Sequence, residues 1–150
     1  MAGVLRDQAT AYMEGHNVMT LATHGPEGVW AAAVFYANDG FTLQFLSAPS
    51  SRHSRNIAAS PRVAVTIQED YRGWREIQGI QLEGTCEKLE GQRKSIAVER
   101  YRAKFPIVGP DAPPEIARAL DKIAWYEVTP ERLFFIDNSV KLGHREEIVI

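Results

Sequence analysis

The chain has 150 residues, of which 45% are hydrophobic, and a formal net charge of -2 with acidic and basic residues interspersed. This length suits one domain over residues 1–150, and the charge balance excludes the broad basic surface that nucleic-acid or membrane binding needs. Charged residues interrupt the N-terminal segment, no later stretch is long enough to cross a bilayer, and the single cysteine fits a reducing compartment, so we expect a cytoplasmic protein with no nucleic-acid or membrane partner.

Hydrophobic periodicity and turn residues divide the chain into short helices and strands. Alternating apolar residues indicate strands, spacing of three or four indicates helices, and the turn Asn38-Asp39-Gly40 is the strongest hairpin signal. Gly79 and Gly84, in the expected strand over 77–89, are candidate positions for bends or bulges. The expected elements are, in chain order, a helix over 4–16, strands over 18–23, 29–37 and 41–47, a short helix over 51–60, strands over 63–68 and 77–89, a helix over 93–105, a helical segment over 115–121, and strands over 123–129 and 132–137.

The order of these elements predicts the fold class. Hairpins come early and helices are inserted between later strands, which argues against a parallel doubly wound sheet, because such a sheet alternates strand and helix regularly. We expect a mainly β protein: a six- to seven-stranded antiparallel split barrel with Greek-key character, flanked by short helices. The tail after Asn138 carries no clear signal.

The expected strand over 29–37 has no polar face. Trp30, Ala32 and Val34 line one side, and small or apolar residues line the other. A half-exposed antiparallel strand shows polar residues toward solvent, so this strand is expected to be covered on both sides. Either a second subunit, a flat ligand or the chain's own helices provides the second cover.

The junction after the third strand resembles an anion site. Segment 47–56 reads Ser-Ala-Pro-Ser-Ser-Arg-His-Ser-Arg-Asn and opens a short helix, whose first N–H groups and dipole favour an anion. Ser50 or Ser51 can cap the helix, Arg52 offers a fork of donors suited to phosphate, and His53 and Arg55 can add charge or donors. A capped surface helix with ordinary basic residues is the alternative.

These pieces together resemble the FMN-binding split-barrel superfamily, the pyridoxamine 5'-phosphate oxidase-like proteins. The resemblance rests on the hairpins, a strand ending in Leu46-Ser47, the motif Ser51-Arg52-His53, the segment 60–65, and a long strand containing glutamine and glycine. It covers residues 18–89 well and 123–137 more loosely. The remaining segments are more similar to a small bacterial branch of that superfamily than to the vitamin B6 enzyme.

The resemblance implies FMN as the cofactor and assigns residues to it. In this family a Ser-Arg-Lys-like motif binds the phosphate, the backbone of the second strand runs along the isoalloxazine ring, and a glutamine on the long strand approaches the flavin. The implied cofactor-binding residues are Ala31, Ala32, Ala33, Val34, Ser47, Ser51, Arg52, His53 and Gln78.

Two features of the chain, at three positions, depart from the oxidase. Ala31 and Tyr36 stand where the oxidase places basic residues, and His53 replaces the usual lysine. A neutral imidazole contributes a hydrogen bond without charge, although protonation at mildly acid pH restores the charge. We therefore expect weaker FMN binding than in the oxidase, and we do not transfer pyridoxamine phosphate as the substrate.

The resemblance also implies a homodimer with two FMN sites, each built from both chains. The leading hypothesis is an FMN-dependent oxidoreductase acting on an unidentified small molecule, with the flavin supplying the redox chemistry and the catalytic residues unknown. A non-catalytic flavin- or haem-binding protein for storage, sensing or delivery is the rival, and a structural dimer without ligand is a third possibility. The four histidines lack metal-ligand spacing, so no protein-built metal site is expected.

Overall fold

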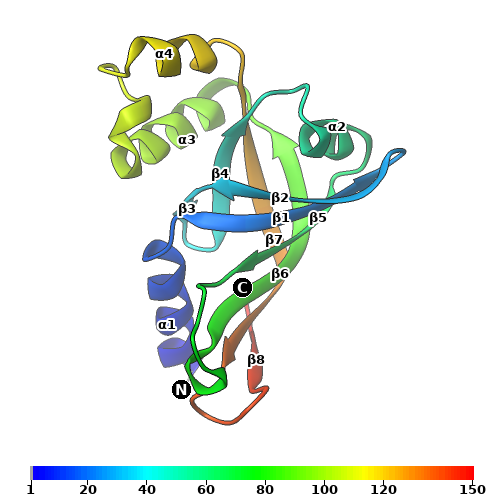
Figure 1. The fold of residues 1–150 in the computed structure, drawn as a ribbon, viewed down its shortest axis with the longest axis vertical. Coiled ribbons are helices and arrows are strands. Elements are labelled where there is room, and N and C mark those ends of the chain that lie inside the picture. Colours follow the sequence, from blue (N-terminus) through cyan, green and yellow to red (C-terminus); the bar gives the residue numbers. More distant parts are fainter. Residues whose placement is uncertain (1) are drawn as a thin grey trace.

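A curled antiparallel sheet forms the centre of the molecule, as the computed structural model of residues 2–150 shows (Figure 1). This confirms the predicted mainly β, split-barrel fold. Two short 3₁₀ segments accompany the main elements, at Trp74–Glu76 and Pro106–Val108. The main elements are α1 (Ala2–Glu14), β1 (Val18–Gly25), β2 (Gly28–Phe35), β3 (Ala37–Asp39), β4 (Thr42–Ser47), α2 (Arg52–Ala59), β5 (Arg62–Ile67), β6 (Gln78–Lys88), α3 (Gly91–Lys104), α4 (Pro114–Leu120), β7 (Ala124–Asp137) and β8 (Arg145–Ile148).

The strand order explains how the sheet curls. It runs β2-β1-β5-β6-β7-β4-β3, with β8 paired to β7 beside this path. β2 and β3 therefore lie at opposite edges, although only Tyr36 separates them in the sequence. The chain passes from one edge to the other at this residue, so the sheet must close into a half-barrel.

The single strand predicted over 29–37 is wrong in one respect, because Tyr36 divides it. The Tyr36 N–H donates to the Asn17 carbonyl at 3.0 Å, and its buried hydroxyl donates to the Met13 carbonyl. Beyond Tyr36 the chain pairs with β4 through the predicted Asn38–Gly40 hairpin. A local pattern does not reveal this division, since both halves remain extended and apolar.

β6 and β7 form the longest ladder and run along the long axis, while β1 and β2 lie across it (Figure 1). β7 is one continuous strand, which corrects the prediction of two strands separated at Pro130. The register shifts between Glu83 and Gly84, opposite Pro130, so a bulge accommodates the proline. A Cβ on Gly84 would lie 2.1 Å from the Thr129 carbonyl oxygen, which explains why glycine occupies the bulge. β8 forms from the tail for which no element was predicted.

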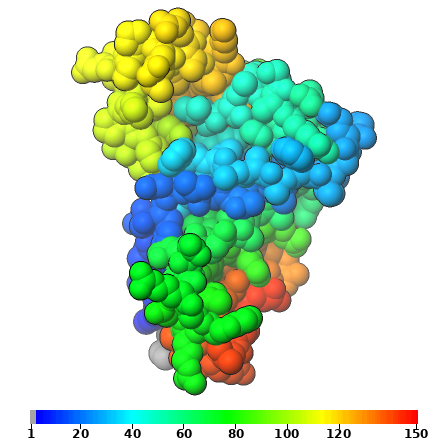
Figure 2. Space-filling model, in the orientation of Figure 1, coloured from blue at the N-terminus to red at the C-terminus, as the bar shows by residue number. Residues whose placement is uncertain are grey.

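The inner face of the sheet holds the main hydrophobic core. Ile80, Leu82 and Cys86 are buried on one side of β6, as their alternation predicted. A second cluster around Tyr101 and Trp125 fixes α3 to the sheet, and the α3–α4 region projects from the body of the molecule (Figure 2). Among residues 2–150, no helix combines the length and the apolar character that crossing a membrane requires.

Candidate functional site

Helix α2 begins where β4 ends, and Ser51 defines its first turn. Ser51 has extended backbone angles and its hydroxyl accepts a hydrogen bond from the Ser54 N–H at 3.3 Å, so it is the N-cap. The helix stops before Pro61, as predicted. Its N-terminus therefore presents backbone N–H groups and the positive end of its dipole beside the end of β4.

Three of the predicted site residues form one cluster at this junction. His53 Nε2 lies 2.6 Å from Ser47 Oγ and 3.3 Å from Ser51 Oγ, and the two hydroxyl oxygens lie 3.3 Å apart. Burial of the half-buried imidazole lowers the pKa of His53, which favours its neutral form at neutral pH. The cluster thus offers hydroxyl and imidazole donors at the positive end of a helix.

Arg52 adds a cation to the same helix start. Its Nη2 donates to the Glu27 carbonyl at 2.8 Å, and its guanidinium carbon lies 4.3 Å from the centre of the Trp30 ring. Over the described residues 2–150 this is the single hydrogen bond of its side chain, and its buried Nε finds no partner. Arg52 therefore retains donors for an acceptor that the protein itself does not supply.

Arg55, the other cation of the helix, is already engaged. It donates to both carboxylate oxygens of Glu27, at 2.8 and 2.9 Å, and these bonds lower the pKa of that carboxyl. Asn56 Nδ2 also donates to Thr23 Oγ1 at 3.1 Å, which fixes α2 to β1. These contacts hold the helix against the β1–β2 hairpin but leave Arg52 as the cation available to a ligand.

β2 starts beside this helix and is an edge strand. Ala32 and Val34 face the interior and are partly buried, whereas Ala31 and Ala33 are exposed on the outer face. The backbone groups on the side away from β1 pair with no strand among the described residues. Such an unpaired edge can bond the polar rim of a flat ligand.

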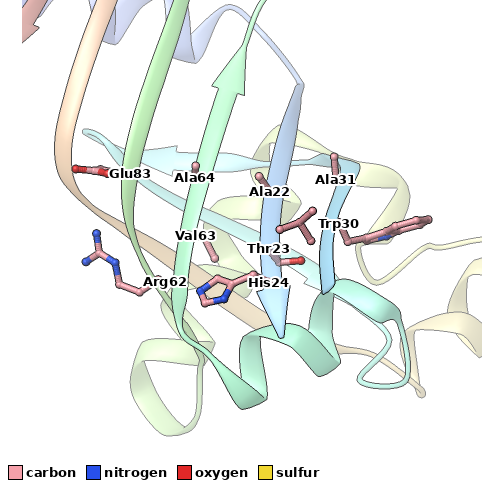
Figure 3. A pocket seen from close by; sticks show the side chains of 10 residues that line it. Ala22, Thr23, His24, Trp30, Ala31, Arg62, Val63, Ala64 and Glu83 are labelled. Carbon is pink, nitrogen blue, oxygen red and sulfur yellow. The ribbon is translucent and has the colours of Figure 1, made fainter. Parts of the chain in front are cut away.

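The outer face of the same sheet carries a groove of about 770 Å³ (Figure 3). Ala22 pairs with Ala31 on one side and with Ala64 on the other, so three small side chains form a flat floor. The exposed fraction reaches 81% for Val29 and 56% for Phe35. The chain's own helices therefore do not cover this face. Of the three covers considered from the sequence, a second subunit and a flat ligand remain.

A family model described as pyridoxamine 5'-phosphate oxidase matches residues 5–137. The chain belongs to this family. A UPF0306 protein of Enterobacter sp. strain 638 is 28% identical over 136 residues, which cover 89% of each chain. Within the pyridoxamine 5'-phosphate oxidase family the protein therefore belongs to a small bacterial branch, as the resemblance predicted.

Solved structures agree with this family fold. A putative pyridoxamine 5'-phosphate oxidase from Listeria innocua has a TM-score of 0.66 and 21% identity, and the match covers 86% of this chain and 95% of that one. HutZ, the heme storage protein from Vibrio cholerae, has a TM-score of 0.71 and 14% identity over 85% of this chain and 91% of that one. At these identities the similarity establishes the fold alone.

One residue assigned by the family resemblance lies apart from the others. Gln78 begins β6 and pairs with Asp137, whereas the end of β6 near α2 is Lys88. Ten residues of strand correspond to roughly 33 Å along β6. A single chain therefore does not bring Gln78 to the cluster at α2, and its contact with a flavin stays a prediction that needs the partner chain.

Proposed function

We propose that the protein binds FMN and places the FMN phosphate at the start of α2. The observation that carries this proposal is the helix N-terminus at which Ser47, Ser51 and His53 form a cluster and Arg52, the first residue of the helix, keeps unused donors. A phosphate takes charge from the guanidinium and hydrogen bonds from the hydroxyls and the helix N–H groups. The donor set thus fits a doubly negative group.

From the phosphate site, the ring system of the cofactor would extend along β2. β2 begins beside Arg52, and its unpaired edge offers backbone groups to the polar rim of the ring system. Bound FMN would supply hydride transfer between a reductant and a small substrate. The chain's residues would orient it and exclude water, and the proposed activity is a flavin-dependent oxidoreductase in the cytoplasm.

We also propose that a second copy of the chain covers the outer face of β2. The exposed apolar side chains of β2 and the alanine floor of the groove suit a flat, close contact between identical sheets. A two-fold interface there would leave the phosphate site at its margin. The partner chain would then supply the part of the ring pocket that one chain leaves open.

The function is tested by Arg52→Ala and the dissociation constant for FMN, measured by flavin fluorescence. A charge-assisted hydrogen bond contributes about 1.5–3 kcal/mol, so affinity should fall roughly 10- to 150-fold. Arg118→Ala, in α4 and away from the cluster, is the control and should bind FMN like the wild type. An unchanged constant for Arg52→Ala, or no FMN binding by the wild type, contradicts the proposal.

A non-catalytic flavin- or haem-binding protein is the second candidate, supported by the similarity to the heme storage protein HutZ. Among the described histidines, His24 lines the outer groove and is the residue that haem ligation there would need. The optical spectrum of freshly purified protein separates the ligands, because flavin and haem absorb differently. Reduction of bound flavin by NADH or NADPH, followed by reoxidation by a substrate, then separates an enzyme from a carrier.

A further inference from the structure

The side chain of Arg52 is held by two groups from the β1–β2 hairpin. The Trp30 ring lies under the guanidinium at 4.3 Å, and the Glu27 carbonyl accepts from Nη2 at 2.8 Å. Trp30 is itself 44% exposed and is among the residues that line the outer groove (Figure 3). An aromatic ring at the sheet edge thus contacts the cation of α2.

We infer that Trp30 is a positioning residue for phosphate binding, which it supports through Arg52 and without contact to the phosphate. This inference rests on the proposed function, because Arg52 is the residue that would pair with the FMN phosphate. It goes further by assigning a role to a β2 side chain that is not among the cofactor-binding residues implied by the family resemblance. The inference depends on two contacts of the Arg52 guanidinium: it stacks on the Trp30 ring, and it donates to the Glu27 carbonyl.

The physical reason is the conformational freedom of an arginine at a helix start. A free guanidinium occupies many rotamers, and fixing it on binding costs entropy. The ring face and the carbonyl fix it beforehand, so less entropy is lost when a phosphate binds. This matters in this chain because Ala31 and Tyr36 stand where the oxidase family places basic residues, and Arg55 is paired with Glu27.

The inference predicts an effect on the phosphate end of the ligand only. Trp30→Leu should weaken FMN binding roughly two- to fivefold, the range for an exposed cation–π contact, and should leave riboflavin binding unchanged. Trp30→Phe keeps an aromatic face and should retain most of the affinity. Trp74→Leu makes the same substitution at an exposed tryptophan of the β5–β6 connection and should leave both constants unchanged.

A double-mutant cycle with Arg52→Gln distinguishes positioning from direct contact. If Trp30 acts through Arg52, Trp30→Leu adds no further loss in the Arg52→Gln background. Independent, additive losses overturn the inference, as does an equal loss of riboflavin affinity. If the wild type binds riboflavin and FMN equally well and Arg52→Gln changes neither, the proposed phosphate site fails instead.

A ligand-free measurement keeps the inference testable in that case. The buried Arg52 Nε–H lies beside the indole, so its proton resonance should show a ring-current shift and slow exchange with water. Trp30→Leu should remove both signatures, whereas Trp74→Leu should preserve them. An Arg52 Nε–H resonance that is identical in the wild type and Trp30→Leu shows that the ring does not hold the guanidinium and overturns the inference.

Discussion

His53 is the residue at which this chain differs most clearly in chemistry from the family motif. Its Nε2 lies within hydrogen-bond distance of the hydroxyls of Ser47 and Ser51, and its burial favours the neutral imidazole. A lysine at the same position would carry a charge at every physiological pH. Because Arg55 is paired with Glu27, the candidate site has one permanent cation available to a ligand, Arg52, and one residue, His53, whose charge depends on pH and on the ligand.

The lowered pKa of His53 predicts how stability changes with pH. The unfolded chain protonates this histidine at higher pH than the folded chain does, so stability is complete above the ordinary value of about 6.5 and is lost as pH falls below it. The slope for one proton is at most about 1.4 kcal/mol per pH unit, and partial exposure reduces it. Urea unfolding of the ligand-free wild type and His53→Gln between pH 7.5 and 5.5 measures the difference. A difference that does not vary with pH contradicts this prediction.

At the scale of elements, the ladder of β6 and β7 depends on the bulge at Gly84. The extra residue in β7 lets Pro130 sit inside a continuous strand, where a proline would otherwise remove a ladder hydrogen bond. The neighbours of Gly84 are backbone atoms of Thr129 and Pro130, which cannot move aside like a flexible side chain. The bulge therefore fixes the register of β6 against β7, and β7 in turn pairs with β4, which ends at Ser47.

Gly84→Ala should destabilise the protein by about 1–3 kcal/mol, because the added methyl group would lie 2.1 Å from the Thr129 carbonyl oxygen. Gly73→Ala is the matched control, since no atom lies within 4 Å of the position of its Cβ and its φ of -133° suits alanine. Chemical unfolding of the three proteins at one pH measures both changes. Equal stability of the two variants would show that the strands adjust without cost.

For the whole molecule, the decisive feature is the apolar outer face of β2 and β1. Edge strands in monomeric proteins carry charges or other protection against pairing, whereas the outer face of β2 here presents Val29, Ala31, Ala33 and Phe35. The row of Ala31, Ala22 and Ala64 lies flat across three strands. A second copy of the sheet would bury this surface, and this is the basis of the proposed dimer.

Ala22→Glu should convert the proposed dimer to a monomer, because it places an unpaired carboxylate at the centre of the face. Sedimentation velocity measures the change, and loss of FMN should accompany it if both chains build the site. Val140→Glu, a substitution at an exposed residue outside this face, should leave the assembly intact. A wild type that sediments as a monomer, or a dimeric Ala22→Glu variant, would contradict the proposed interface.

Local signals predicted the parts of this fold that neighbouring residues decide. The Asn38–Gly40 turn, the Ser51 cap and the stop before Pro61 depend on contacts within a few positions, and each was found as expected. Ser47, Ser51 and His53 were also brought together, since β4 leads directly into α2. Trp30 and Glu27 were missed as partners of α2, because no local pattern links residues that far apart.

The sequence by itself therefore determined most of the secondary structure, the antiparallel fold class and the cluster at the start of α2. Tertiary structure alone decided that the chain crosses the sheet at Tyr36, that Pro130 lies within a continuous strand, and that Trp30 holds Arg52. It also separated Gln78 from α2 within one chain. The physical reason is the separation in sequence between the interacting residues. Turns and caps arise from neighbouring backbone groups, whereas sheet closure decides which side chains far apart in the sequence meet.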